Sequence, residues 1–223
     1  MTIILSYNVK WNSNKNEINN IFKNIKNVVN TYDIDFLLFQ EAFFHKKIIK
    51  LIDKTIYNFY LHKSDKDILL TIYKKKYKIE NVYNHEFEKG RPFSIFYLLN
   101  KDINEYLFLI NLHAGHHPNI NYHIFNPINK IMKKLENKAK MFIMGGDFNK
   151  NIIEKYNITT KNKIFKLYNL KSNKKTCCDT NNERLTYISD HVICSKKPIK
   201  KITYNKNFPA SDHLMILVKL KDF

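Results

Sequence analysis

Glycine, proline and cysteine are scarce in this chain of 223 residues, which has 4 Gly, 5 Pro and 3 Cys. So few glycines and prolines argue against long disordered linkers, and a hydrophobic fraction of 44% is enough to build a core. The odd number of cysteines, with Cys177 next to Cys178, makes no disulfide framework and favours a reducing compartment. We therefore expect a single domain over 1–223 in an intracellular location, cytoplasmic or nuclear.

Long apolar runs are also missing. No run is long enough to span a bilayer, so we expect no membrane association. The stretch 1–8 lacks the basic residues that begin a signal peptide and soon turns polar, which predicts a strand there instead.

Acidic residues are few relative to basic ones, since 20 Asp+Glu face 38 Lys+Arg and leave a net charge of +18. Such a charge favours a polyanionic partner, because bound phosphates release counterions. The chain is also crowded with Lys, Asn and Ile, as expected from an A+T-rich genome, in which Lys is the default surface residue. Both explanations of the charge stay open.

Hydrophobic periodicity outlines the secondary structure. It predicts helices over 15–31, 45–53 and 121–137. It predicts strands over 2–9, 34–40, 55–62, 67–73, 77–87, 93–99, 106–113, 140–145, 185–194, 199–204 and 213–220. Segment 150–180 is polar and is expected to be irregular, with at most one short helix. Many strands and few helices indicate stacked sheets with the helices outside.

Polar residues follow or begin many of these strands. They are Asn8, Glu41, His113, Asp147, Asn149, Asp190, Asp212 and His213. Polar side chains that come from distant parts of a chain and gather at strand ends are how sheet proteins build sites.

Asp147 and Asn149 follow an apolar strand and the pair Gly145-Gly146. Two glycines allow positive φ and close backbone approach. Asp147 can hold a hard cation or orient a water molecule, and Asn149 can donate to a phosphate oxygen. Alone, the same spacing is also typical of an Asx turn at a strand end.

Glu41 ends a fully apolar strand, directly after Gln40. A carboxylate in such a place costs free energy unless it meets a cation or hydrogen-bond donors. Mg²⁺ usually takes one or two carboxylates and keeps several waters, so Glu41 is the leading Mg²⁺ ligand. The alternative is an acid at the N-terminus of the next helix. Asn8 can position Glu41 or a phosphate, or can be a turn residue.

Histidines supply candidate proton-transfer groups. His113 can act as a general acid or stabilise charge in the transition state. His116 and His117 follow it and resemble a zinc-ligand cluster, but no Cys pairs at ligand spacing accompany them. We expect these two in a solvent-facing loop.

Two Asp-His pairs lie on the last predicted strands: Asp212-His213 begins one, and Asp190-His191 lies within another. In Asp212-His213 the carboxylate orients the ring and raises its basicity, which suits activation of water. Asp190 repeats the pattern on the preceding strand and can orient a histidine or serve a metal. By strand alternation its neighbour His191 should point the other way.

Taken together and in order, these motifs resemble the endonuclease/exonuclease/phosphatase superfamily. The resemblance rests on Ser6-Tyr7-Asn8, Gln40-Glu41, Asn111-Leu112-His113, Gly146-Asp147-Phe148-Asn149, Asp190-His191-Val192-Ile193 and Ser211-Asp212-His213. It spans residues 3 to 219. It implies an α+β fold, a four-layer αββα sandwich in which two mainly antiparallel, mixed sheets pack face to face with helices outside. The site would lie at one end of the sheets.

The resemblance also implies roles for individual residues. Glu41 looks like the metal ligand, with Asn8 beside it as a metal and phosphate contact, and Asp212 resembles a second metal-side carboxylate. Asp147 and Asn149 resemble the pair that orients water and binds phosphate.

The same resemblance assigns the remaining residues. His213 resembles the catalytic histidine, and in the family its carboxylate partner comes from the penultimate strand, which points to Asp190. His113 matches a histidine of the deoxyribonuclease I and sphingomyelinase branches. Arg91 lies where the deoxyribonuclease I branch carries an arginine that contacts phosphate, although it can also be a surface turn residue.

The sequence therefore predicts a Mg²⁺-dependent phosphodiesterase, with Mn²⁺ as a substitute, that acts on nucleic acid. We expect DNA to be favoured over RNA and no obligate protein partner. Residues proposed to track the backbone or stack on bases are Lys74, Lys75, Lys76, Lys171, Lys174, Lys175, Tyr73 and Tyr77. Two alternatives stay open: an inositol-phosphate phosphatase or sphingomyelinase-like phosphoesterase, and an inactive nucleic-acid-binding module.

Overall fold

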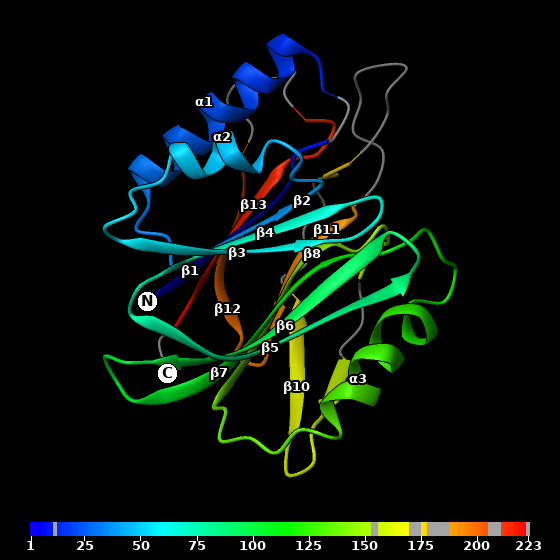
Figure 1. The fold of residues 1–223 in the computed structure, drawn as a ribbon. Coiled ribbons are helices and arrows are strands. Elements are labelled where there is room, and N and C mark those ends of the chain that lie inside the picture. The colour runs from blue at the N-terminus through cyan, green and yellow to red at the C-terminus, as the bar shows by residue number, and fades with distance from the viewer. Residues whose placement is uncertain (11–12, 153–155, 170–174, 178–187, 205–210, 222–223) are drawn as a thin grey trace.

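Two β-sheets face each other in the computed structural model, with helices α1 and α2 over one sheet and α3 over the other (Figure 1). The structure describes residues 1–10, 13–152, 156–169, 175–177, 188–204 and 211–221. Among these residues, no helix is long and apolar enough to cross a membrane.

The first sheet has six strands in the order β12-β13-β1-β2-β4-β3. Their bounds are β1 Thr2–Asn8, β2 Phe36–Gln40, β3 Tyr57–Lys63, β4 Ile68–Lys74, β12 Pro198–Tyr204 and β13 Met215–Leu220. β1 and β2 are parallel, and the other pairs are antiparallel.

The second sheet has seven strands in the order β5-β6-β7-β8-β11-β10-β9. Their bounds are β5 Tyr77–Glu88, β6 Arg91–Asn100, β7 Glu105–His113, β8 Met141–Asp147, β9 Tyr156–Thr159, β10 Ile164–Asn169 and β11 Asp190–Cys194. β7 and β8 are parallel, and the other pairs are antiparallel.

α1 (Lys15–Thr31) has the bounds that its apolar stripe predicts. It begins after Asn14, whose side chain accepts hydrogen bonds from the backbone N–H groups of Asn16 and Glu17, while the Glu17 carboxylate accepts one from the Asn14 N–H. This capping box satisfies N–H groups that a helix start leaves unpaired. The short helix α2 (His45–Lys50) ends three residues before the predicted limit of 45–53.

The segment predicted as one helix over 121–137 is instead a π-helical turn, η1 (Asn121–Phe125), followed by α3 (Asn126–Met132). Pro127 lies in the first turn of α3. Because proline has no backbone N–H, the hydrogen-bond pattern cannot continue unchanged through it. The apolar periodicity carried no trace of this break.

Three buried apolar clusters separate the layers. One packs α1 and α2 against the six-stranded sheet, one fills the space between the sheets, and one packs η1 and α3 against the seven-stranded sheet. The cluster between the sheets includes Leu38 from β2, Leu109 from β7 and Ile143 from β8. The order helix, sheet, sheet, helix confirms the predicted four-layer α+β sandwich.

The expectation of irregular structure over 150–180 is wrong for 156–159 and 164–169, which are strands. β9 and β10 form an antiparallel pair that extends the seven-stranded sheet. Each strand buries only two apolar side chains, on either side of an Asn or a Lys, so the alternation with a period of two was too short to recognise. In the strand predicted over 185–194, β11 begins at Asp190, and 185–187 lie outside the described residues.

Candidate active site

Strand register brings the predicted polar residues to one end of both sheets. β1 and β2 run parallel with Asn8 opposite Gln40, and β7 and β8 run parallel with His113 opposite Asp147. β11 runs antiparallel to β8 and starts at Asp190, also opposite Asp147. Residues that lie far apart in the sequence therefore meet at the carboxyl ends of four strands.

Asp147 lies at the centre of this group and is 1% exposed. Its Oδ2 accepts a hydrogen bond of 3.0 Å from Asn8 Nδ2, which also donates to Glu41 Oε1 at 3.1 Å. The same oxygen lies 3.6 Å from His113 Nε2 and 3.7 Å from His213 Nε2. Burial favours the neutral acid, but His213 and His113 hold the pKa of Asp147 below its usual range.

His213 is fixed by a carboxylate on β11. Its Nδ1 lies 3.0 Å from Asp190 Oδ2, and Asp190 is 0% exposed. Burial opposes the charged ring, but Asp190 and Asp147 raise the pKa of His213 to about 10. The ring is therefore cationic at neutral pH, and its Nε2 faces Asp147.

Ser211 completes the Ser-Asp-His segment and was not assigned a role from the sequence. Its hydroxyl donates to the Asn8 carbonyl oxygen at 2.7 Å and accepts a hydrogen bond of 3.1 Å from the His213 N–H. This side chain ties the end of β1 to the start of the last strand. Asp212 between them places Oδ1 3.9 Å from His213 Nε2.

His113 has a carboxylate partner of its own, Asp67, which sequence reasoning missed. Asp67 Oδ2 lies 2.7 Å from His113 Nδ1, and Oδ1 accepts a hydrogen bond of 2.9 Å from the Glu41 N–H. Asp67 precedes β4, a strand unrelated in sequence to any motif, so no spacing pointed to it.

Arg91 also contacts the His113 ring, with Nη1 2.6 Å from Nε2 and 3.4 Å from Nδ1. Burial lowers the pKa of His113, Asp67 raises it above its usual value, and Arg91 opposes protonation. A guanidinium nitrogen at this distance can only donate. The His113 ring therefore lies between the Asp67 carboxylate and the Arg91 guanidinium.

Two residues of this group have a left-handed backbone, Glu41 with φ +52 and Asn149 with φ +49. This conformation is costly for residues other than glycine and is concentrated at functional sites. Here it is held by hydrogen bonds: Asp67 accepts from the Glu41 N–H, and Asp147 Oδ1 accepts from the Asn149 N–H at 2.8 Å. Asn149 Nδ2 donates to the Ala114 carbonyl oxygen at 2.7 Å.

His191 points away from Asp147, as strand alternation predicts. Its Nε2 lies 3.1 Å from the Lys150 carbonyl oxygen, and Nδ1 lies 3.1 Å from Asn169 Nδ2. Burial, with Lys201 nearby, lowers the pKa of His191 to about 3.

This neutral histidine should make the fold sensitive to acid. An unfolded chain binds a proton on His191 below its ordinary pKa near 6.5, whereas the folded chain does not until about pH 3. The contribution of His191 to the free energy of unfolding is therefore fully present above about pH 6.5. It is lost as the pH falls, by roughly 2–3 kcal/mol between pH 7 and 4.5. Urea unfolding of wild type and His191→Gln at both pH values checks this, because the variant should lose less. Equal losses in both proteins would contradict it.

The loop after β7 differs in part from expectation. His116 is exposed, but His117 is half-buried, with Nε2 3.0 Å from Glu88 Oε2 and its ring stacked on His123 at 3.6 Å between centroids. The loop is therefore fastened to β5 and η1.

Of the nucleic-acid contacts expected around Lys74, base stacking by the two buried tyrosines is wrong, and Lys74 and Lys76 are engaged in ion pairs. Lys74 and Lys76 form ion pairs with Asp35, at 3.6 and 2.7 Å, and β4 carries them to the end of the sheet opposite Asp67. Tyr73 and Tyr77 are 8% and 1% exposed, so neither ring can stack on a base. Of the remaining lysines in that prediction, Lys75 and Lys175 are exposed, and Lys171 and Lys174 lie outside the described residues.

Cysteine pairing also differs from expectation. Cys177 is disulfide-bonded, whereas Cys194 is a buried free cysteine. Cys177 also pairs with His213 in an isolated bridge, with Sγ 3.2 Å from Nε2. It therefore lines the side of the ring that faces Asp147.

The charges of this cluster fit a divalent cation. Its acidic members are Glu41, Asp67, Asp147, Asp190 and Asp212. Its basic members are Arg91, His113 and His213. Five negative charges against at most three positive ones leave an excess of at least two negative charges. Such an excess in a buried site is costly unless a cation offsets it.

Two groups of candidate metal ligands are available. Asp147, Asp190 and His213 offer atoms within 4.8 Å of one another, but Asp190 and His213 already bind each other and are buried. The side chains of Glu41 and Asp212 are 18% and 23% exposed. A hard cation that keeps several waters suits this second, more open pair.

Comparisons with known proteins agree with this geometry. No protein-family model and no curated protein matches the sequence. Among solved structures, the chain is similar to a mannosyl-6-phosphatase from Bacteroides thetaiotaomicron, with a TM-score of 0.76, 16% identity and coverage of 100% of both chains. It is similar to a humanized D. rerio TDP2, with a TM-score of 0.74, 14% identity and coverage of 99% of each chain.

A third solved structure carries the family's name. It is an endonuclease/exonuclease/phosphatase family protein from Leptotrichia buccalis, with a TM-score of 0.73, 15% identity and coverage of 100% of both chains. The chain therefore has the endonuclease/exonuclease/phosphatase fold that its motifs predicted.

Proposed function

We propose that this chain is a Mg²⁺-dependent phosphodiesterase, with Mn²⁺ as a substitute, that hydrolyses phosphodiester bonds of nucleic acid. One observation carries the proposal: Asp147 lies between two histidines, each fixed by its own carboxylate, and shares Asn8 with Glu41. Ordered donors and a metal-binding carboxylate around one buried acid are what phosphoester hydrolysis requires.

Glu41 and Asp212 would hold the cation. Asn8 lies beside them, but its Oδ1 accepts the Lys10 N–H at 3.1 Å and its Nδ2 faces the carboxylates, so its role is to orient Glu41 and Asp147. When bound, a divalent cation neutralises phosphate oxygens and makes phosphorus more electrophilic.

The protein's own groups carry the remaining steps. Asp147 orients the attacking water and takes its proton as the water oxygen bonds to phosphorus. The bond from phosphorus to the leaving oxygen breaks, and that oxygen keeps the electron pair and is protonated by solvent. His213, Asn149 and Arg91, which His113 holds in place, bind the non-bridging oxygens, where charge develops.

Nucleic acid is the proposed substrate because of the +18 net charge, and DNA is favoured over RNA. In line with this, the chain is similar to a D. rerio TDP2 solved in complex with a single-strand DNA product, with a TM-score of 0.70 and 15% identity over 97% of each chain. A phosphomonoesterase is the second candidate, because the chain matches the mannosyl-6-phosphatase over its full length.

A substrate panel separates these functions. Single-strand and duplex DNA, RNA, 5′-tyrosyl DNA, inositol phosphates and mannose 6-phosphate would each be incubated with Mg²⁺ or EDTA. We expect EDTA-sensitive cleavage of DNA. Release of inorganic phosphate from the sugar phosphates alone would instead establish the second candidate. Binding of DNA with no turnover of any ester would indicate an inactive nucleic-acid-binding module.

Asp67→Asn tests whether Asp67 positions His113 for the reaction. Asn presents either an acceptor or a donor to His113 Nδ1, and the Glu41 N–H competes for its one acceptor oxygen. We expect turnover to fall on the order of 10–100-fold. Asp65→Asn is the matched control, since Asp65 is 71% exposed and should leave turnover unchanged. Equal activity of the two variants would show that Asp67 does not position the site.

A further inference from the structure

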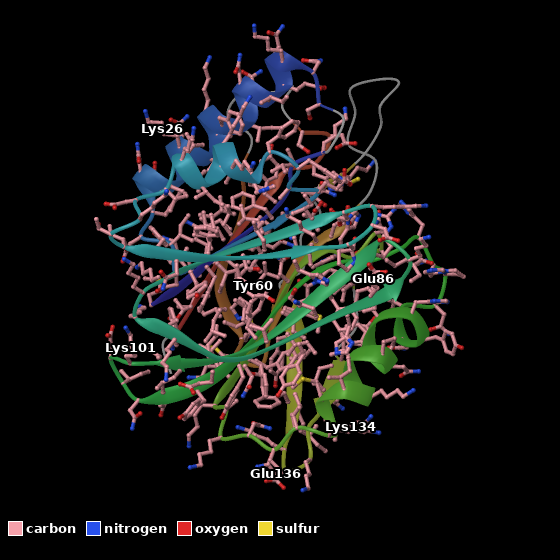
Figure 2. The ribbon with its side chains drawn as sticks, viewed as in Figure 1. Lys26, Tyr60, Glu86, Lys101, Lys134 and Glu136 are labelled. Carbon is pink, nitrogen blue, oxygen red and sulfur yellow. The ribbon has the colours of Figure 1, made fainter. Side chains whose placement is uncertain are left out.

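Eight exposed lysines lie on two neighbouring segments that the proposed reaction does not use. They are Lys130, Lys133, Lys134, Lys138, Lys140, Lys161, Lys163 and Lys166, and together they are called the distal lysine surface here. Within 126–140 and 156–169, all of which the structure describes, Glu136 is the one acidic residue. Figure 2 shows Lys134 and Glu136 at the lower end of the molecule.

Hydrogen bonds join the two segments into one surface. Asn137 Nδ2 donates to Asn162 Oδ1 at 3.1 Å, and Asn162 Nδ2 donates to the Asn137 carbonyl oxygen at 2.8 Å. The Lys161 N–H also donates to the Leu135 carbonyl oxygen at 3.2 Å. The lysines are therefore held at fixed spacing along a rigid scaffold.

Few of these charges are neutralised. Lys161 pairs with Glu136, and Lys163 donates to the Ala139 carbonyl oxygen at 3.1 Å with its ammonium 4.7 Å above the Phe165 ring. The other six lysines form no ion pair within the part of the chain that the structure describes. Like charges gathered on one surface repel one another, and a polyanion relieves that repulsion.

This surface lies far from the candidate active site. Lys140 precedes β8, whose last residue is Asp147, so seven strand steps of about 3.3 Å separate them by roughly 23 Å. β10 pairs Tyr168 with Cys194 at the end of β11 that is remote from Asp190, and its first residue, Ile164, lies four residues further away. The lysines therefore cannot contact a phosphate that is bound at Asp147.

We propose that the distal lysine surface binds the phosphate backbone of nucleic acid, independently of base sequence. Dispersed lysines on a rigid surface match a chain of regularly spaced phosphates, and each contact releases counterions. A lipid bilayer fits poorly, because Ile164 is the one large apolar side chain exposed within these two described segments, and membrane-binding surfaces need an apolar face to insert. The inference does not depend on catalysis at Asp147.

Binding in EDTA tests the inference without turnover. The probe is a fluorescein-labelled single-strand DNA of about 30 nucleotides, followed by anisotropy between about 50 and 200 mM salt. For Lys133→Glu, Lys134→Glu and Lys138→Glu combined, we expect at least about tenfold weaker binding. We also expect the slope of log K against log salt to fall by about 2, at roughly 0.7 per lost phosphate contact. The same three lysines changed to Gln should give a smaller loss in the same direction, and this neutral variant decides the test if the first one does not fold.

The matched control reverses three exposed lysines over the other sheet, Lys23→Glu and Lys26→Glu on α1 with Lys50→Glu on α2. Its net charge equals that of the first variant. If DNA binds at the distal lysine surface, this control should keep the wild-type slope of log K against log salt. Equal loss in both variants would overturn the inference, because binding would then follow net charge alone. Unchanged DNA binding by the first variant would also overturn the inference. So would a first variant that loses binding to phosphatidylserine vesicles but keeps binding to DNA. Because the readout is binding, the inference stands or falls separately from the proposed phosphodiesterase.

Discussion

Asp147→Asn should reduce kcat for DNA cleavage by about 10³-fold or more while the protein stays folded. The carboxylate is the acceptor for the proton of the attacking water in our proposal, and a carboxamide of the same shape cannot take that proton. The change also removes the negative charge that lies 3.6 Å from His113 Nε2 and 3.7 Å from His213 Nε2. Initial rates on end-labelled DNA in Mg²⁺ measure the loss.

The matched control for this change is Asp33→Asn. Asp33 is also an aspartate but is 87% exposed, and it pairs with Lys74 at the opposite end of the six-stranded sheet. It should keep wild-type activity. Asp147→Asn activity within about tenfold of wild type would contradict the role given to Asp147, since a lost general base normally costs 10²–10⁴-fold.

Gly146→Ala should destabilise the fold more than any other single glycine change we propose. Gly146 has φ +152, and an added Cβ would lie 1.9 Å from the Leu112 carbonyl oxygen and 2.9 Å from the Leu112 carbonyl carbon. These atoms belong to the neighbouring strand β7 and cannot move without breaking its pairing with β8. We expect a loss of about 4 kcal/mol or more, which lowers Tm by roughly 10 °C in a chain of this size.

Gly115→Ala is an informative control, because an added Cβ would come as close to its nearest atom as at Gly146. An added Cβ there would lie 1.9 Å from Glu88 Oε1, but this atom is the tip of a flexible side chain that is 44% exposed. We expect a loss within about 1 kcal/mol. Thermal unfolding of both variants decides the matter. A similar Tm for the two proteins would mean that the Leu112 backbone yields, and that the glycine is not required for close approach at this strand end.

Much of the candidate site could be predicted from the sequence because its residues stand at strand ends that periodicity identifies. Asn8, Glu41, His113 and Asp147 each follow an apolar run, and strand pairing then brings them to one edge. Asp190 pairs with Asp147 on the neighbouring strand for the same reason. The resemblance in motif order added the layer arrangement, which periodicity alone does not determine.

Other parts could not be predicted, because they depend on tertiary contact. In the sequence, Asp67 is an ordinary acidic residue before a strand. Only the packing of the folded chain places it against His113. Arg91 was assigned to phosphate, and its contact with the same ring depends on how β6 aligns with β7. The high pKa of His213 arises from two carboxylates that lie on other strands. The net charge of the sequence likewise does not predict that Lys74 forms ion pairs with Asp33 and Asp35.

The central claim is that the Asp147 cluster hydrolyses phosphodiester bonds with the aid of a divalent cation. Its most direct test is cleavage of end-labelled DNA by the purified chain, with wild type in Mg²⁺, wild type in EDTA and Asp147→Asn in Mg²⁺ side by side. We predict shortened products only from wild type in Mg²⁺. Intact DNA in all three reactions, or equal cleavage by wild type and Asp147→Asn, would contradict the claim.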